Sequence, residues 1–193
     1  MKKNLTLIIF FAFLACQFTY SQKHFDVNGV IVPRHIDFKG KQLELNGFGT
    51  RSKLWMDVYV QALYLSVLSQ DAEAILNSNS VMGIRIQITS SLVTSKKLSK
   101  AFEKGLRKSI GEENIEKIRP QADILEKLIG REPTVEKDFF NLIYSPEDTS
   151  IWVYKNDKLE GKIPGLEFKK AFFGIWLSDN PVDSDLKNDL LGK

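Results

Sequence analysis

The sequence predicts an α+β fold in which helices cover a large antiparallel β-sheet. Residues 84–89 alternate between apolar and polar side chains, which is typical of an antiparallel strand with one buried and one solvated face. A stripe of apolar residues at fourfold spacing then follows: Leu98, Phe102, Leu106 and Ile110. This spacing is typical of an amphipathic helix. Because strand-like and helix-like segments occur in groups rather than in strict alternation, the pattern favours α+β over α/β.

The segments before this strand predict further strands and turns. Residues 25–45 contain short extended runs, interrupted at Pro33 and by a Lys-Gly-Lys turn at 39–41. The Asn-Gly-Phe-Gly sequence at 46–49 predicts another break in the chain. Residues 53–66 form a long run that is rich in aromatic and β-branched side chains, a composition typical of strands.

The second half predicts helices, then strands, then helices again. The first helix begins near Ser95 and ends at Gly111, and residues 112–129 predict a helical stretch that Pro120 divides. Strands are expected at 139–144, 150–154 and 159–163, with the tip of a hairpin at Asn156-Asp157.

The C-terminal segment predicts two packed helices. One apolar stripe on the first helix is formed by Phe168, Phe172, Ile175 and Trp176. Such a stripe is expected to lie in the core. Asn180 is expected to cap the last helix, with Pro181 at its first position and Asp183 in its first turn.

The N-terminus predicts a secretory signal peptide. Lys2 and Lys3 precede an apolar run over residues 5–18, and small or tolerated residues lead to a cleavage site after Ser21. The predicted organisation is a signal peptide at 1–21 and one domain at 22–193, with the mature protein periplasmic or secreted. The competing interpretation is a membrane anchor, but the run is shorter than the roughly 20 residues that span a bilayer as a helix. No stable membrane insertion is expected after cleavage. A lipoprotein anchored through Cys16 is the alternative.

The charge of the expected mature chain argues against nucleic-acid binding. Of the 27 basic residues, Lys2 and Lys3 leave with the signal peptide, and the remaining 25 face 24 acidic residues. Nucleic-acid binding requires a basic stripe that displaces counterions, and this balance supplies none. The basic run along residues 96–108 is interpreted as the solvated face of its helix, or as weak attraction to an anionic surface.

Several classes of chemistry lack their usual residues. His24 and His35 are the only histidines, and no carboxylates accompany them at the spacing of a metal site, so neither a metal nor a cofactor is expected. Cys16 is the only cysteine and lies in the signal peptide, and no Gly-x-Ser-x-Gly sequence is present. Nucleophilic hydrolysis is therefore not indicated.

Three segments resemble the bacterial branch of the chalcone isomerase-like family. They are residues 45–51 (Leu-Asn-Gly-Phe-Gly-Thr-Arg), 58–65 (Val-Tyr-Val-Gln-Ala-Leu-Tyr-Leu) and 161–192. The family includes plant chalcone isomerases and plant fatty-acid-binding proteins. The resemblance implies an open-faced β-sandwich, a large antiparallel sheet with helices packed on one face, and a ligand cleft between them.

The resemblance also implies site residues. Arg51 matches an arginine that reaches the ligand cleft in the plant enzymes, and a guanidinium suits a carboxylate or a phenolate. Tyr59 occupies the place of an enzyme threonine. The tyrosine and asparagine of the enzymes' first core helix have no match between 94 and 101, and their late serine or threonine falls at Gly174. These departures argue against flavanone-forming chemistry.

The spacing of the two site candidates raises a geometric question. In one unbroken strand, Arg51 and Tyr59 share a face with Trp55 and Gln61, but eight residues of straight strand separate them by roughly 26 Å. They can hold one head group only if the chain bends between Ser52 and Met56. Otherwise Arg51 acts with Lys53 at the cleft mouth, or has no role in binding. Asp57 is a candidate acid to neutralise either base.

The sequence therefore supports three hypotheses. The first is a secreted, non-catalytic domain that binds a small amphipathic molecule such as a fatty acid, with Arg51, Tyr59, Trp55 and Lys53 as ligand-binding residues. The second is an intramolecular lyase (isomerase) of the chalcone isomerase type, with Arg51 and Tyr59 catalytic. The third is a structural or interaction domain with a filled cleft. The oligomeric state is left open.

Overall fold

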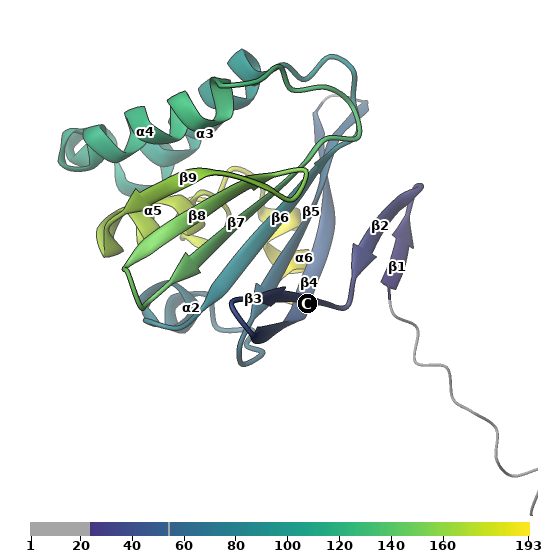
Figure 1. Ribbon diagram of the computed structural model, residues 1–193, viewed down its shortest axis with the longest axis horizontal. Coiled ribbons are helices and arrows are strands. Elements are labelled where there is room, and N and C mark those ends of the chain that lie inside the picture. Colours follow the sequence, from purple (N-terminus) through teal and green to yellow (C-terminus); the bar gives the residue numbers. More distant parts are fainter. Residues whose placement is uncertain (1–23, 54) are drawn as a thin grey trace, which may run out of the picture.

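A curled seven-stranded antiparallel sheet forms the frame of the protein (Figure 1). The computed structural model describes residues 24–53 and 55–193. The strands of the sheet, in spatial order, are β3 (His35–Phe38), β4 (Lys41–Lys53), β5 (Met56–Leu65), β6 (Met82–Ile88), β7 (Phe139–Ser145), β8 (Ser150–Lys155) and β9 (Lys158–Pro164). The predicted signal peptide at 1–21 lies outside the described residues and stays a prediction.

Helices pack on one face of this sheet, as the α+β, open-faced sandwich prediction expected. They are α2 (Ala72–Asn77), α3 (Ser95–Ile110), the 3₁₀ helix η1 (Glu112–Ile118), α4 (Arg119–Gly130), α5 (Leu166–Leu177) and α6 (Ser184–Leu190). The predicted stripe on α5 is in the core, where Phe172 is 0 % and Trp176 is 1 % exposed. No helix in the described part of the chain has the length and apolar character to cross a membrane.

A small N-terminal hairpin packs on part of the other face. It consists of β1 (His24–Val27) and β2 (Val30–Pro33), which form a separate two-stranded sheet. Val30 and Val32 join a second apolar cluster with side chains of β5. The Tyr64 hydroxyl donates a hydrogen bond to the Pro33 carbonyl at 2.8 Å. The face opposite the helices is thus partly covered near β4 and β5.

The predicted break at 46–49 is wrong, because β4 continues through it with a bulge at Asn46. The Asn46 amide accepts from Ser69 N and donates to the Leu190 carbonyl, which ties the bulge to the C-terminus. A Cβ atom on Gly47 would collide with backbone oxygens of α6, and one on Gly49 would collide with the Asp189 side chain. The glycines here let a helix approach a strand closely, rather than making a turn.

The strand-like run at 53–66 forms a strand only from Met56, as β5. The chain reverses between Lys53 and Met56, so that β4 and β5 form an antiparallel hairpin. Aromatic and β-branched composition continues across this reversal, and composition alone therefore concealed it. The reversal decides which residues of the candidate site meet.

Helix ends follow local capping rules, with one shift. Thr94 caps α3 through a bond from Lys97 N, and Gly111 ends it at φ +85°, close to the prediction. The helix that was predicted to begin at Pro181 begins at Ser184 instead, because Asp183 accepts from the first free amides and acts as the N-cap. Asn180 donates its side-chain amide to Lys108 O.

Candidate functional site

The β4–β5 hairpin places Arg51 directly opposite Tyr59. The two residues are cross-strand partners in the antiparallel register, so their Cα atoms lie about 5 Å apart rather than the roughly 26 Å of a straight strand. Directly opposed residues project from the same face of a sheet. Tyr59 belongs to the core cluster on the helix-covered face. The chain therefore bends where the shared-site hypothesis required it to bend.

Arg51 reaches the N-terminus of α6. Its Nη1 donates to Asp183 Oδ2 at 2.7 Å and to its neighbour's carbonyl, Ser52 O, at 2.6 Å. Asp183 uses its other oxygen to cap α6. Asp57, the acid that the sequence suggested, instead accepts from the Ser52 hydroxyl at 2.7 Å. The side chains of Arg51 and Asp183 are 27 % and 20 % exposed, so the ion pair lies at the edge of the core.

Tyr59 presents a buried, neutral hydroxyl beside this pair. Its oxygen accepts a hydrogen bond from Trp176 Nε1 at 3.1 Å. Burial raises the pKa of Tyr59 to about 12, and Asp183 acts in the same direction, while the Trp176 bond and the Arg51 charge oppose them. The phenol is therefore protonated at neutral pH. Since its oxygen already accepts a bond, its own proton is the group that it offers to a ligand.

Gln61 lies one cross-strand pair further along the same face. Its side chain is completely buried, yet neither Oε1 nor Nε2 has a hydrogen-bond partner among the described residues. Gly49 lies opposite it on β4 and adds no side chain, and Ile86 flanks it on β6. Buried amides are nearly always paired, because an unpaired one costs about 1–3 kcal/mol. Gln61 is thus the least satisfied polar side chain near Arg51 and Tyr59.

The other two predicted ligand-binding residues do not join this cluster. Trp55 lies at the turn between β4 and β5 and is 89 % exposed. Lys53 is exposed at the end of β4 and forms no ion pair with any described residue. The hairpin that joins Arg51 to Tyr59 carries these two residues away from the core.

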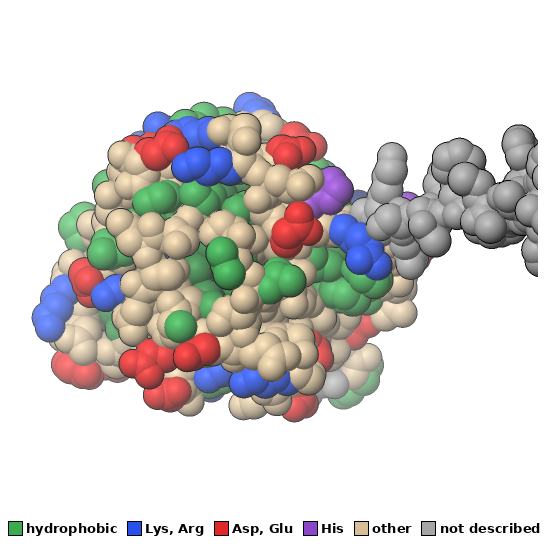
Figure 2. All heavy atoms as spheres, turned by 90° about the horizontal axis from the view of Figure 1, so that it is seen from below, with side chains coloured by type: hydrophobic (Ala, Val, Ile, Leu, Met, Phe, Trp, Pro, Cys, Tyr) green, Lys and Arg blue, Asp and Glu red, His purple; other side chains and the backbone are tan. Residues whose placement is uncertain are grey.

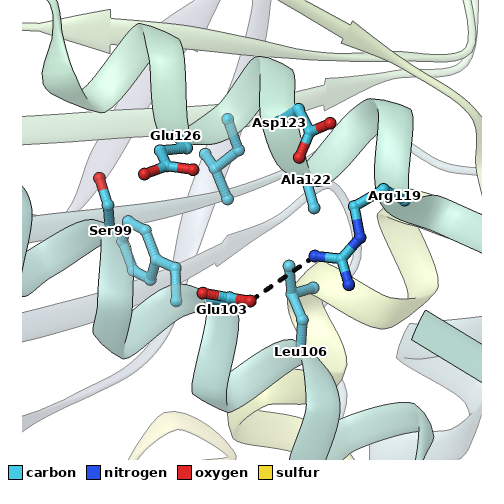
Figure 3. Close-up of a pocket in the computed structure, with 9 residues that line it drawn as sticks. Ser99, Glu103, Leu106, Arg119, Ala122, Asp123 and Glu126 are labelled. Atoms are coloured by element: carbon cyan, nitrogen blue, oxygen red, sulfur yellow. Dashed lines mark ion pairs between the residues drawn. The ribbon is translucent and has the colours of Figure 1, made fainter. Parts of the chain in front are cut away.

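Two pockets lie away from this cluster. One, of about 40 Å³, lies between α3 and α4, where Glu103 and Arg119 approach to 3.6 Å (Figure 3). The other, of about 110 Å³, lies between α2 and the adjoining ends of β5 and β6. Figure 2 views the end of the molecule that carries α2, where apolar side chains gather toward the centre and charged ones toward the edge. Neither pocket is lined by Arg51 or Tyr59.

Aromatic side chains fill the space between the sheet and α3 and α5. Phe102, Phe172 and Trp176 pack edge to face, with ring centroids 5.4–6.1 Å apart. Close helix contacts continue this packing, since a Cβ atom on Gly174 would collide with the Ser109 hydroxyl. Gly174 is the position at which the resemblance placed the late serine or threonine of the enzymes. In this chain the position serves helix packing.

Sequence reasoning did not assign two members of the cluster, Asp183 and Gln61, to the site, although each had a local signal. Asp183 precedes a helix, and an N-cap aspartate uses only one oxygen for the cap. Gln61 is a polar residue at a strand position whose neighbours on the same face, Tyr59 and Leu63, are core residues. A polar residue in the buried register is therefore a sequence signal for a site.

The sequence profile of the chalcone isomerase-like family matches residues 24–192. The chain belongs to the chalcone isomerase-like family. This confirms the resemblance that the three segments indicated. No curated protein sequence is significantly similar to the chain.

Among solved structures, the fold of this chalcone isomerase-like protein is similar to that of a fatty-acid binding protein from Arabidopsis thaliana. The TM-score is 0.67 at 18 % identity, over 84 % of this chain and 92 % of the plant protein. At this identity the likeness establishes the fold. It agrees with the half-barrel sheet and the helices on one face.

The cluster combines groups that can bind an acid. A cation, a neutral hydroxyl donor and an unpaired amide lie on neighbouring positions of β4 and β5. In the described part of the chain, no three His, Cys, Asp or Glu side chains gather where they could hold a metal ion. The arrangement can hold a carboxylate or a carbonyl oxygen in place.

Proposed function

We propose that this protein is a non-catalytic binding protein for a small amphipathic acid, of which a fatty acid is the leading class. The observation that carries the proposal is the meeting of Arg51, Tyr59 and Gln61 on one buried face, where each has donors that the protein does not use. The fatty-acid binding protein of similar fold supports the ligand class. Secretion follows from the predicted signal peptide, and N-terminal sequencing that finds Gln22 first would support it.

Arg51 has donors available for a carboxylate. Only Nη1 bonds to described residues, through Asp183 and Ser52, which leaves Nη2 and Nε free. A guanidinium binds a carboxylate best through two parallel N–H groups. The ligand can therefore bind beside Asp183 without displacing it. The negative charge of Asp183 weakens the attraction between Arg51 and the ligand carboxylate. In return, the ion pair with Asp183 holds the arginine side chain in place.

The same geometry favours binding over catalysis. The pKa of Tyr59, raised to about 12, keeps the phenol protonated, so it donates a hydrogen bond and does not act as a base at neutral pH. Gly174 adds no hydroxyl, and the α3 segment at 94–101 lacks the tyrosine and asparagine of the enzymes. A site with one cation and neutral donors suits the retention of an acid.

The tail of the ligand must displace aromatic side chains. Ligand pockets usually enclose about 300–1,000 Å³, far more than either pocket described above. The interior beside Tyr59 is filled by Trp176, Phe172 and Phe102. We expect the tail to enter between the sheet and α5 as these rings move. Affinity should therefore increase with chain length only up to the length that this movement admits.

Removing the guanidinium tests the head-group site. Arg51→Ala should weaken binding of a fatty acid by about 1.5–3 kcal/mol, the usual value of a hydrogen bond to a charged group. Binding of the matching fatty alcohol should be nearly unchanged, because it carries no charge. Isothermal titration of both ligands against both proteins measures the difference. Equal losses for acid and alcohol would indicate a general collapse of the site, and no loss would remove Arg51 from it.

Neutralising Asp183, the partner of Arg51, should change the affinity for a fatty acid in the opposite direction. Asp183→Asn keeps a good N-cap residue on α6 but removes the charge that competes for Arg51. We expect the fatty acid to bind several-fold more tightly, with the alcohol unaffected. Weaker binding of the acid would show that Asp183 is needed to hold Arg51 in place.

The packed aromatic interior favours one second candidate, a structural or interaction domain with a filled cleft. In that case lipid extraction and mass spectrometry of the purified protein should find nothing bound, and titration with fatty acids should give no heat. Turnover of a chalcone that is lost in Arg51→Ala would instead support the isomerase hypothesis.

A further inference from the structure

Exposed apolar side chains gather on three loops at one end of the sheet. The loops are the β4–β5 turn, the segment after β6 and the segment between α4 and β7, which meet at the upper right of Figure 1. Their large apolar residues are Trp55, Leu92 and Val135, exposed by 89 %, 56 % and 56 %. We call these three residues the apolar tip. Trp55 is the most exposed large apolar residue of the described chain.

Hydrogen bonds hold the three loops together. The Ser90 hydroxyl contacts Met56 Sδ at 3.4 Å, which joins the loop after β6 to the β4–β5 turn. Ile88 exchanges backbone bonds with the third loop, donating to Asp138 O and accepting from Lys137 N, both at 2.9 Å. The three loops that carry the apolar tip are therefore bonded to one another.

Lysines without carboxylate partners occur on the loops of the apolar tip and on the first turns of α3. On the three loops and the first turns of α3, the lysines that form no ion pair with a described residue are Lys53, Lys96, Lys97, Lys100 and Lys137. Only Asp57 and Glu136 are acids without an ion-pair partner there, since Glu132 and Asp138 are paired with Lys158 and Lys155. Lys97 donates to the Leu92 carbonyl at 2.9 Å, which places a cation beside the tip.

The opposite end of the molecule has exposed apolar residues without this charge. Val67 and Leu68, just past β5, are 80 % and 58 % exposed. Acids follow them, with Asp71 at the N-cap of α2 and Glu73 in its first turn. Exposed apolar residues thus occur at both ends of the sheet, but in the described part of the chain they are accompanied by several lysines without ion-pair partners only at the apolar tip.

We propose that the apolar tip docks on an anionic lipid bilayer, with Trp55 inserted at the level of the headgroups. Trp is favoured at membrane interfaces because its ring is apolar and its N–H is polar. Each lysine close to an anionic surface adds attraction that is screened by salt. One ring and two aliphatic side chains give shallow, reversible docking rather than insertion. The proposal does not depend on the ligand class assigned to Arg51, although Arg51 lies on β4 next to this end.

Vesicle binding of the expected mature chain, residues 22–193, tests the proposal without any added fatty acid. The protein should sediment with vesicles of phosphatidylcholine and phosphatidylglycerol and stay in solution with phosphatidylcholine alone. High salt should release it. The tryptophan emission should shift to shorter wavelength on binding. This shift should vanish in Trp55→Ala, because Trp176 is already buried and Trp152 packs against the second apolar cluster, on the face that the N-terminal hairpin partly covers.

Two pairs of variants separate the tip from the opposite end. Trp55→Ala should lower the partition coefficient about tenfold, whereas Val67→Ala, past the other end of the same strand, should not change it. Lys53→Glu should also lower it about tenfold, whereas Lys41→Glu, at the other end of β4, should have little effect. Unchanged unfolding midpoints would show that each variant is folded.

Three outcomes would overturn the proposal. Equal binding to neutral and anionic vesicles would show that the lysines do not contribute to docking. No binding to either kind of vesicle would show that the apolar tip does not bind a membrane. A dimer that Trp55→Ala dissociates, seen by sedimentation velocity, would show instead that the apolar tip is covered by a second copy of the chain.

Discussion

Two buried polar side chains on the helix-covered side of the sheet have opposite surroundings. Lys169 of α5 is fully buried, and its ammonium donates to three carbonyls at the C-terminus of α2, those of Ile75, Leu76 and Ser78, at 2.8–3.2 Å. Gln61 of β5 is equally buried and donates to and accepts from no described residue.

The difference indicates which of the two is structural. Helix α2 has no basic residue in its last turn, and Lys169 supplies the positive charge and the donors that its carbonyls need. All hydrogen bonds of the Lys169 ammonium are thus used within the fold. Burial of the unpaired Gln61 amide lowers the free energy of unfolding of the free protein, and no hydrogen bond offsets this loss. A buried polar group that the fold leaves unpaired is better explained by a ligand than by packing.

The largest change in stability is expected from replacing Lys169, whose hydrogen bonds are satisfied within the fold. Lys169→Met should lower the free energy of unfolding by about 3 kcal/mol at pH 9, because buried carbonyls at the end of α2 lose their hydrogen-bond donor. Lys170→Met, at the next residue, is the control, since Lys170 forms only a surface ion pair with Glu167 at 3.7 Å and should change little. Urea denaturation measures both. An unchanged free energy of unfolding in Lys169→Met would mean that α2 does not need the lysine.

Replacing Gln61, whose amide is unpaired, should change the free energy of unfolding in the opposite direction. Gln61→Met removes a buried amide without changing the length of the side chain, and should raise the free energy of unfolding by about 1–2 kcal/mol. It should at the same time weaken fatty-acid binding. Gln87→Met, a half-buried glutamine on the other face of β6, is the matched control and should change neither quantity.

Gln61→Met could instead destabilise the protein. That result would show that the free protein already satisfies the amide, and it would end the contrast with Lys169.

A smaller effect is expected from pH. Burial lowers the pKa of Lys169 from 10.5 to about 8, so the unfolded chain holds more protons than the folded one between these values. Stability must therefore rise with pH across this window. The contribution of Lys169 should increase by about 1.4 kcal/mol from pH 7 to pH 9. Urea denaturation of the wild type and of Lys169→Met at both pH values isolates it, and a difference between the two proteins that does not change with pH would contradict the lowered pKa.

Much of the fold could be predicted from local pattern. The fourfold spacing on α3, the alternation on β6, the Asn156-Asp157 turn and the buried stripe on α5 all agree with the structure. Each depends on residues within one element, whose side chains must share a face when the element forms. The resemblance to the chalcone isomerase-like family lay in the same local segments.

The candidate site could be predicted only in part. Sequence reasoning found Arg51 and Tyr59 but left open whether the chain bends between them, gave Asp57 as a candidate acid and included Trp55 and Lys53. The hairpin reversal, the Asp183 partner and the close approach of α6 to Gly49 are contacts between residues far apart in the chain. Composition does not encode which distant elements meet.

The sequence by itself determined the class of fold, the helix on residues 95–110, the core stripe of α5 and the family. Only the tertiary structure decided that Arg51 meets Tyr59, that Lys169 caps α2 and that Gln61 is buried without a partner. The physical reason is that periodic burial is a property of one helix or strand, whereas the satisfaction of a buried charge or amide depends on the groups that other elements bring to it.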